Sequence, residues 1–277
     1  MSILNNSSDA GRGWINRWTD LESTSGRVGV STLGTLSLIV IWHVVASLRI
    51  TGDLLPDPVS IVLAFSESKS LIVSNFWFTA KTALIGYVIA VVLAVVSGVL
   101  LTWRDDIRRS LMPLIVGGNT IPRITLAPLL VFYISGFRSR WVLVAWMAFL
   151  PMLINTVEGF GVINDDLENL LEATGASKFQ QYKYVRLYNG IPFLLDGMKI
   201  SLSLAVTGAV VVEFILAQET RGIGYLVYNA MNYYQIDLMF ASVILIAFSA
   251  LAFHILLFVI QDRLIHWRES GLLTGGA

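Results

Sequence analysis

Long apolar runs separated by short polar segments set the pattern of the chain. A helix needs about 20 apolar residues to cross a hydrocarbon core of roughly 30 Å. Runs of about that length predict six membrane-spanning helices, at residues 28–48, 79–103, 111–134, 141–156, 194–216 and 238–260. The pattern therefore indicates an all-α membrane protein.

The third run is interrupted by Pro113, Pro122 and Pro128. Proline removes a backbone donor, and a lipid-facing helix would leave the freed carbonyl groups unpaired. We therefore expect this span to be irregular and to face protein or a cavity rather than lipid.

Most Lys and Arg residues fall in alternate loops, and cytoplasmic loops of membrane proteins hold the excess of positive charge. With both termini inside, the cytoplasmic set is Arg12, Arg17, Arg27, Arg104, Arg108, Arg109, Lys178, Lys183, Arg186, Arg263 and Arg268. The opposite set is about half as large, so the bias predicts an N-in, C-in topology.

The segments outside the spans divide the chain into four parts. Residues 1–27 form a tail that carries no signal-peptide core and is expected to be cytoplasmic. Within it, Trp14, Ile15, Trp18 and Leu21 recur at helical spacing, so this part is either a helix in the headgroup region or a disordered tail. Residues 28–78 hold the first span and its outer loop, 79–263 the core, and 264–277 a cytoplasmic tail.

Composition supports a membrane protein and excludes several chemistries. Charged residues make up 14% of the chain, against about 25% in soluble domains. The formal net charge of zero gives no reason to expect nucleic acid as a partner. Cysteine is absent, which excludes disulfides and thiolate sites.

The longest cytoplasmic loop, residues 158–192, exceeds the usual two to eight residues between packed helices. Asp165 and Asp166 can begin one helix, Gly175 can end it, and Ala176 and Ser177 can begin a second. The sequence thus predicts two short helices that meet at a sharp angle and face the cytoplasm.

Within this loop, the run TGASKFQQYKYVRLYNGIP from Thr174 resembles the EAA loop of bacterial ABC importer permeases. The resemblance is strongest to the branch that serves nitrate, sulfonates, taurine and pyrimidine vitamin precursors. NTIPRITLAPLLVFYISGF from Asn119, FLPMLINT from Phe149 and VVEFILAQETRGIGYLV from Val211 are similar to further family segments, in the same order. The resemblance implies the type I ABC importer permease fold.

In that family the loop forms a coupling helix that docks in a groove of a cytoplasmic ATPase. Small residues suit such a contact because they let two backbones approach closely. Two departures mark the loop as divergent: the Glu-Ala-Ala positions hold Asn169, Leu170 and Leu171, and a frequent proline position holds Tyr188. Carried over by position, the docking residues are Glu172, Ala173, Thr174, Gly175, Ala176, Ser177 and Lys178.

Three polar residues within the spans are candidates for the translocation pathway or its gate: Arg123, Asn155 and Glu213. Arg123 either attracts an anionic or polar substrate group, pairs with a carboxylate as a gate, or satisfies carbonyl groups freed by the prolines. Asn155 either lines a cavity or bonds to a neighbouring helix, and we favour the helix bond. Glu213 either lines the outer vestibule, pairs across a dimer, or meets headgroup water.

Other isolated residues have simpler interpretations. His43 and His254 lie alone in apolar spans and are expected to be packed or hydrogen-bonded rather than ligands. The tyrosines between the last two spans are typical of an aromatic belt, and part of that surface would alternatively meet a solute-binding protein.

The chain lacks a GxxxxGK[ST] phosphate loop and the HExxH, CxxC and GxSxG patterns. We therefore expect no enzyme activity, cofactor or metal in this chain, with ATP and Mg bound by a partner ATPase.

These expectations describe the permease subunit of an ABC importer for a small organic solute or anion: a sulfonate, nitrate, taurine or a pyrimidine-like precursor. The implied partners are a second permease copy in a homodimer, two ABC ATPase subunits, a periplasmic or lipid-anchored solute-binding protein, and membrane lipids. The expected location is the bacterial inner membrane, as a multi-pass protein. The alternative is an ion-gradient-driven secondary transporter or channel, which the lack of an inverted repeat disfavours.

Overall fold

The structure is a computed structural model. It describes residues 24–48, 54–134, 138–161, 170–171, 173–216 and 221–264, and the regular elements within these ranges are helices. The expected headgroup helix around Trp14 and the tail after Leu264 lie outside the described residues. The chain forms two compact units, residues 1–64 and 65–277, which are described separately.

The first unit contains α2 (Thr24–Ser47) and most of α3 (Pro58–Glu67). Near the end of α2, His43 Nδ1 bonds to the carboxylate of Asp57, and Trp42 Nε1 donates to the carbonyl of Pro56 at 3.1 Å. The prediction that His43 is hydrogen-bonded is confirmed. Its partner Asp57 also accepts the Val59 backbone N–H at 3.3 Å, at the start of α3.

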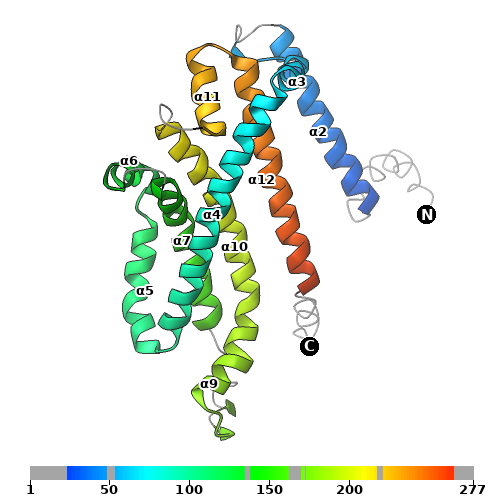
Figure 1. Ribbon diagram of the computed structural model, residues 1–277. Coiled ribbons are helices and arrows are strands. Elements are labelled where there is room, and N and C mark those ends of the chain that lie inside the picture. Colours follow the sequence, from blue (N-terminus) through cyan, green and yellow to red (C-terminus); the bar gives the residue numbers. More distant parts are fainter. Residues whose placement is uncertain are drawn as a thin grey trace, which may run out of the picture. The chain divides into compact units, whose positions relative to one another are not determined.

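The second unit is built on three helices that pack along one another: α4 (Lys69–Thr102), α7 (Arg138–Gly161) and α10 (Leu187–Ile215). Figure 1 shows α7 beside α4 and α10, and α7 is the most buried of the candidate spans. We call the end where α4 and α7 finish the α9 end, and the opposite end the α11 end.

Small residues bring these three helices close together. A Cβ placed on Gly208 of α10 would lie 3.0 Å from Met147 Sδ of α7, and one on Gly197 would lie 2.8 Å from Asn155 Cβ. The first separation is tighter than nearly all real Cβ contacts and the second is shorter than a side chain allows, so the backbone of α10 lies against side chains of α7 at both positions. Such small-residue seams hold helices together where burial from water gives no driving force.

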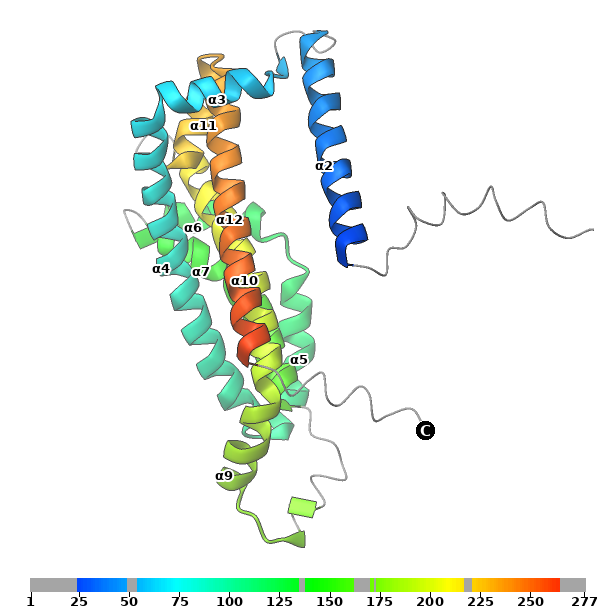
Figure 2. The same ribbon diagram turned by 90° about the vertical axis from the view of Figure 1, so that its right-hand side faces the viewer.

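The expected third span, residues 111–134, is not one continuous helix: it is divided between α5 (Asp105–Asn119) and α6 (Arg123–Tyr133), and the expected irregularity is present. The break falls at Thr120–Pro122, where Pro122 has an extended backbone, with ψ of 97°. Proline also restricts the residue before it away from the helical region, which explains the break. Figure 2 shows α5 and α6 as separate ribbons.

Two further helices complete this unit. The short α11 (Ile223–Asn232) precedes α12 (Ile236–Leu264), which packs against α10, α11 and α4. None of the most apolar window of α12 is buried, as befits a lipid-facing helix. Among the described residues, four helices are long and apolar enough to cross a membrane: α4, α7, α12 and the continuous helix Lys178–Ile215. The count of six spans and the N-in, C-in topology stay predictions.

Candidate functional site

The protruding turn that precedes α10 ends one helical segment and begins another. Gly175 has a φ of +70°, and the Ala176 N–H reaches back to the Leu171 carbonyl at 3.0 Å. This six-to-one bond around a left-handed residue is the Schellman ending of a helix, and glycine adopts it without a Cβ penalty. The helix break expected at Gly175 is present.

The next helix, α9 (Lys178–Gln181), begins with a capping box. The Gln180 N–H donates to Ser177 Oγ at 3.3 Å, and the Ser177 N–H donates to Gln180 Oε1 at 2.8 Å. The two bonds satisfy backbone donors that a helix start leaves unpaired. They fix the angle at which the chain turns from Gly175 into α9.

We call residues 173–178 the α9 corner, and it projects from one end of the second unit (Figure 1). Ala176 is half-buried and the rest of the corner is exposed. Among the described residues other than Gly175 and its two chain neighbours, no atom lies within 4 Å of a Cβ built on Gly175, so the space there is open to a partner. Glu172, also expected to dock, lies outside the described residues.

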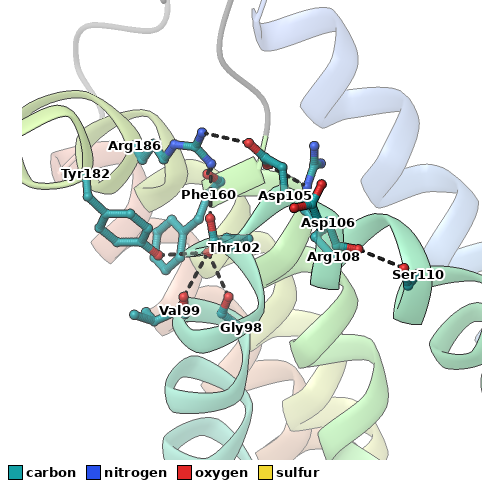
Figure 3. A network of polar contacts seen from close by, with 10 residues as sticks. All are labelled: Gly98, Val99, Thr102, Asp105, Asp106, Arg108, Ser110, Phe160, Tyr182 and Arg186. Carbon is teal, nitrogen blue, oxygen red and sulfur yellow. Dashed lines mark hydrogen bonds and ion pairs between the residues drawn. The ribbon is translucent and has the colours of Figure 1, made fainter. Parts of the chain in front are cut away.

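Behind the corner, the π-helical segment Tyr182–Arg186 joins α9 to α10 and carries a polar network (Figure 3). The Tyr182 hydroxyl bonds to Thr102 Oγ1 at 2.9 Å, and Thr102 is the last residue of α4. The Tyr182 ring packs on the ring of Phe160 near the end of α7, with the ring centroids 6.0 Å apart. Tyr182 thereby touches the ends of both helices.

Arg186 completes this network from the other end of the π-segment. Its Nη1 donates to the carbonyls of Thr102 at 3.2 Å and Phe160 at 3.4 Å, and its Nη2 lies 3.6 Å from Asp105 Oδ2 (Figure 3). Its side chain is only 10% exposed. Sequence reasoning counted Arg186 as one of many cytoplasmic cations and missed this position. The four-residue spacing from Tyr182, which puts both on one helix face, is the signal that was available.

Arg123, predicted as a pathway or gate residue, is the first residue of α6. Its Nη2 donates to Asn119 Oδ1, and its Nη1 donates to the Met147 carbonyl of α7 at 2.6 Å. Pro151 lies four residues after Met147 and has no N–H to give that carbonyl. Within one chain, Arg123 therefore serves a proline-freed carbonyl, but the proline is Pro151 of α7 rather than one of the prolines of its own run, as the structural alternative had expected. Its pathway role stays a prediction.

Asn155 is half-buried in α7, and its amide donates to the Pro151 carbonyl of the same helix at 2.8 Å. The side-chain bond is therefore within α7 rather than to a neighbouring helix, as had been favoured. Asn155 still lies where α7 and α10 approach closely, opposite Gly197.

Glu213 is fully buried, two residues before the end of α10. Its Oε2 accepts the Thr79 hydroxyl of α4 at 2.8 Å and the Gly224 N–H of α11 at 3.0 Å. In a single chain, Glu213 thus lies inside the packed helices rather than at a water-facing surface.

Two more bonds fix the start of α11 to α4. The Ile223 N–H donates to Thr79 Oγ1 at 2.7 Å, and the Gly222 N–H donates to Asn75 Oδ1 at 2.8 Å. Three backbone donors at a helix start, which lack partners in their own helix, are satisfied this way. We call Asn75, Thr79, Glu213 and the 222–224 backbone the α11 latch. The sequence singled out Glu213 but not its partners.

The three candidate pathway residues do not form one site in this chain. Within the described ranges, Arg123, Asn155 and Glu213 each bond to different partners. The described residues contain no group of three His, Asp or Glu side chains suited to a metal ion. The α9 corner, with the network behind it, is thus the candidate functional site that the described residues support best.

Comparisons with known proteins agree with this arrangement. The chain is 30% identical to the formylaminopyrimidine transport permease protein ThiX of Halalkalibacterium halodurans, over 86% of this chain and 96% of the relative. It is 27% identical to the taurine transport system permease protein TauC of Escherichia coli, over 96% and 98% of the two chains. A chain of the MetNI methionine ABC transporter in inward-facing conformations shares the fold, with a TM-score of 0.60 at 18% identity, over 72% of this chain and 97% of that one.

The family match covers most of the core. Residues 86–269 match the family described as binding-protein-dependent transport system inner membrane component. The matched range runs from α4 through α12 and includes the α9 corner and the network of Tyr182 and Arg186. The chain therefore belongs to this family, the inner-membrane permease subunits of ABC importers.

Proposed function

We propose that this permease carries a small organic solute or anion, a sulfonate, nitrate, taurine or a pyrimidine-like precursor, which a solute-binding protein delivers. Membership of the family makes the chain a permease component of an ABC importer rather than an enzyme. It also sets aside the ion-gradient-driven alternative. The proposal adds the substrate class, the partners and the residues that couple transport to ATP.

The names of the relatives support the substrate class. One is a permease for formylaminopyrimidine and another for taurine, so the branch serves small polar molecules with and without a sulfonate. Arg123 had favoured an anion, but its guanidinium nitrogens already bond to Asn119 and Met147. We therefore propose that the solute-binding protein selects among these cargoes.

The observation that carries the coupling proposal is the exposed α9 corner. It projects beyond the packed helices, is built from small residues around a left-handed glycine, and is locked by a capping box. A rigid, narrow projection of this kind can enter a groove without a bulky side chain keeping the backbones apart. We propose that it docks in a partner ATPase, with residues 172–178 as the contact.

In the proposed cycle, two permease copies form the path and two ATPases, which bind ATP and Mg, bind below at the α9 corners. ATP binding closes the ATPases, draws the corners together and rocks the helices to face outward; hydrolysis resets them. Arg123, Asn155 and Glu213 remain the proposed pathway or gate residues.

The test uses the permease in nanodiscs with its ATPase partner. ATP hydrolysis is measured with the candidate binding protein, empty or loaded with taurine, nitrate or formylaminopyrimidine. We expect one loaded form to stimulate hydrolysis above the empty form. No stimulation by any of them, with the complex intact, would overturn the proposed substrate class.

A further inference from the structure

We propose that Arg186 is a positioning residue that joins α9 to α4, α5 and α7 as one block, so that a displacement of the α9 corner moves these helices together. The inference rests on the proposed coupling role of the corner. It assigns to a residue outside the corner the task of passing the motion onward.

Arg186 bonds to the C-terminal ends of two helices. A helix leaves its last carbonyl groups without backbone donors, and its C-terminal end favours a positive charge. Thr102 is the last residue of α4, and Phe160 is one residue from the end of α7. Arg186 donates to both carbonyls from one buried guanidinium. It therefore holds the ends of two helices that are far apart in the sequence.

Arg186 also contacts the start of α5. Asp105 is the first residue of that helix and lies 3.6 Å from Arg186 Nη2. Asp105 also pairs with Arg108 one turn later, at 3.3 Å, which fixes the carboxylate relative to α5. The planar guanidinium can serve acceptors in several directions at once, which a lysine ammonium on a flexible stem does less well. Three helix ends thus meet at one side chain (Figure 3).

α9 connects to Arg186 through unbroken helix. Residues 178–215 form a continuous helix through the π-segment, in which the Leu187 N–H bonds to the Tyr182 carbonyl. Tyr182 and Arg186 thus bracket one wide π turn, and π-bulges are frequent at functional sites. Along this helix, Tyr182 and Arg186 are the places where the segment leaving the α9 corner bonds to the ends of α4 and α7. A displacement of the α9 corner is passed to α4 and α7 only while Tyr182 and Arg186 keep these bonds.

The experiment exploits the absence of cysteine in the chain. Spin labels are placed on Phe179→Cys, which is 63% exposed on α9, and Arg109→Cys, which is exposed on α5. Distances are measured by double electron–electron resonance in the permease–ATPase complex in nanodiscs, without nucleotide and after trapping with ATP and vanadate. One rigid block predicts the same narrow distance in both states.

Arg186→Gln should allow α9 to move relative to α4, α5 and α7. We expect the distance between the labels to shift or broaden on trapping, while Lys183→Gln leaves it unchanged. Lys183 is the matched control because it is an exposed cation of the same π-segment. Arg186→Lys should give a change of the distance on trapping that is smaller than in Arg186→Gln and larger than in Lys183→Gln. Tyr182→Phe, which removes only the bond to Thr102, gives a second test if Arg186→Gln does not insert, and should widen the distribution on trapping.

An unchanged distance in both Arg186→Gln and Tyr182→Phe would overturn the inference. A distance distribution that broadens equally with and without nucleotide would also overturn it, because that result is expected if Arg186 only stabilises the fold. Failure of the proposed coupling looks different: the unaltered permease would then not retain its ATPase during purification, before any distance is measured.

Discussion

The guanidinium of Arg123 lies 2.6 Å from the carbonyl oxygen of Met147, the acceptor that a proline four residues later leaves without a backbone donor. The contact joins the start of α6 to the middle of α7 across the break in the third apolar run. Two prolines are linked by this contact. Pro122 interrupts the apolar run before α6, and Arg123, which follows it, donates to the carbonyl that Pro151 of α7 leaves without a backbone donor.

This relationship predicts a coupled pair of substitutions. Arg123→Leu should lower the stability of the permease by about 1–3 kcal/mol, because the buried Met147 carbonyl loses its donor. The cost should be much smaller in a Pro151→Ala background, which restores the N–H of residue 151. Thermal unfolding of the four proteins in detergent measures the coupling energy.

Equal costs in both backgrounds would contradict the carbonyl-repair role. Uptake by the double variant tests the other role. If Arg123 only donates to the Met147 carbonyl, the double variant should recover both stability and transport. If Arg123 contacts cargo or gates the path, the double variant should be stable but should not transport.

The α9 corner predicts a separation between docking and folding. Ala173→Trp should prevent the ATPase from co-purifying while the thermal unfolding of the permease alone stays unchanged, because Ala173 is exposed. Gly175 is a poorer first choice, because a larger residue at φ of +70° adds a backbone cost of roughly 1–2 kcal/mol.

Gly175→Asn is a suitable companion, since asparagine tolerates the left-handed conformation. It should retain the ATPase more fully than Gly175→Trp. Normal co-purification and normal uptake by Ala173→Trp and Gly175→Trp together would argue against docking at this corner.

The α11 latch predicts that shape matters more than charge at residue 213. Glu213→Gln keeps an oxygen that can accept the Thr79 hydroxyl and the Gly224 N–H, so it should be only mildly destabilising. Glu213→Leu leaves the buried Gly224 N–H without its acceptor, at about 1–3 kcal/mol, and leaves the Thr79 hydroxyl only the longer bond to the Asn75 carbonyl, at 3.3 Å. Thermal unfolding and hydrogen exchange of residues 223–232 should both report the loss. A Leu variant as stable as the Gln variant would refute the latch.

The capping box predicts a local effect. Ser177→Ala should destabilise the start of α9 by about 1 kcal/mol, because the Gln180 N–H loses its acceptor. Ser177→Thr retains a capping hydroxyl and serves as the control. Hydrogen exchange of residues 178–181 should accelerate in the Ala variant and not in the Thr variant; equal exchange in the two would show that the box does not hold the corner.

Local chemistry explains which features could be predicted from the sequence. The ending at Gly175, the helix start at Ser177 and the irregular third run follow from glycine, serine and proline, whose backbone effects act within a few residues. The apolar runs located α4, α7, α10 and α12 because a membrane span must be long and apolar.

The remaining features depend on contacts between distant segments. Arg186 meets Thr102 and Phe160 across separations of 84 and 26 residues, and Glu213 meets Thr79 across 134. No periodicity within one segment records such pairs. The break at Pro122 also turned one expected span into two helices, since an apolar run reports its length but not its continuity.

The most direct test of the coupling account is site-specific crosslinking from the α9 corner. A benzophenone label on Ala173→Cys in this cysteine-free chain, and the same label on exposed Tyr233→Cys at the α11 end, are photoactivated in the intact permease–ATPase complex. We predict a covalent adduct with the ATPase from residue 173 and none from residue 233. An intact complex that gives no ATPase adduct from residue 173 would contradict the central claim.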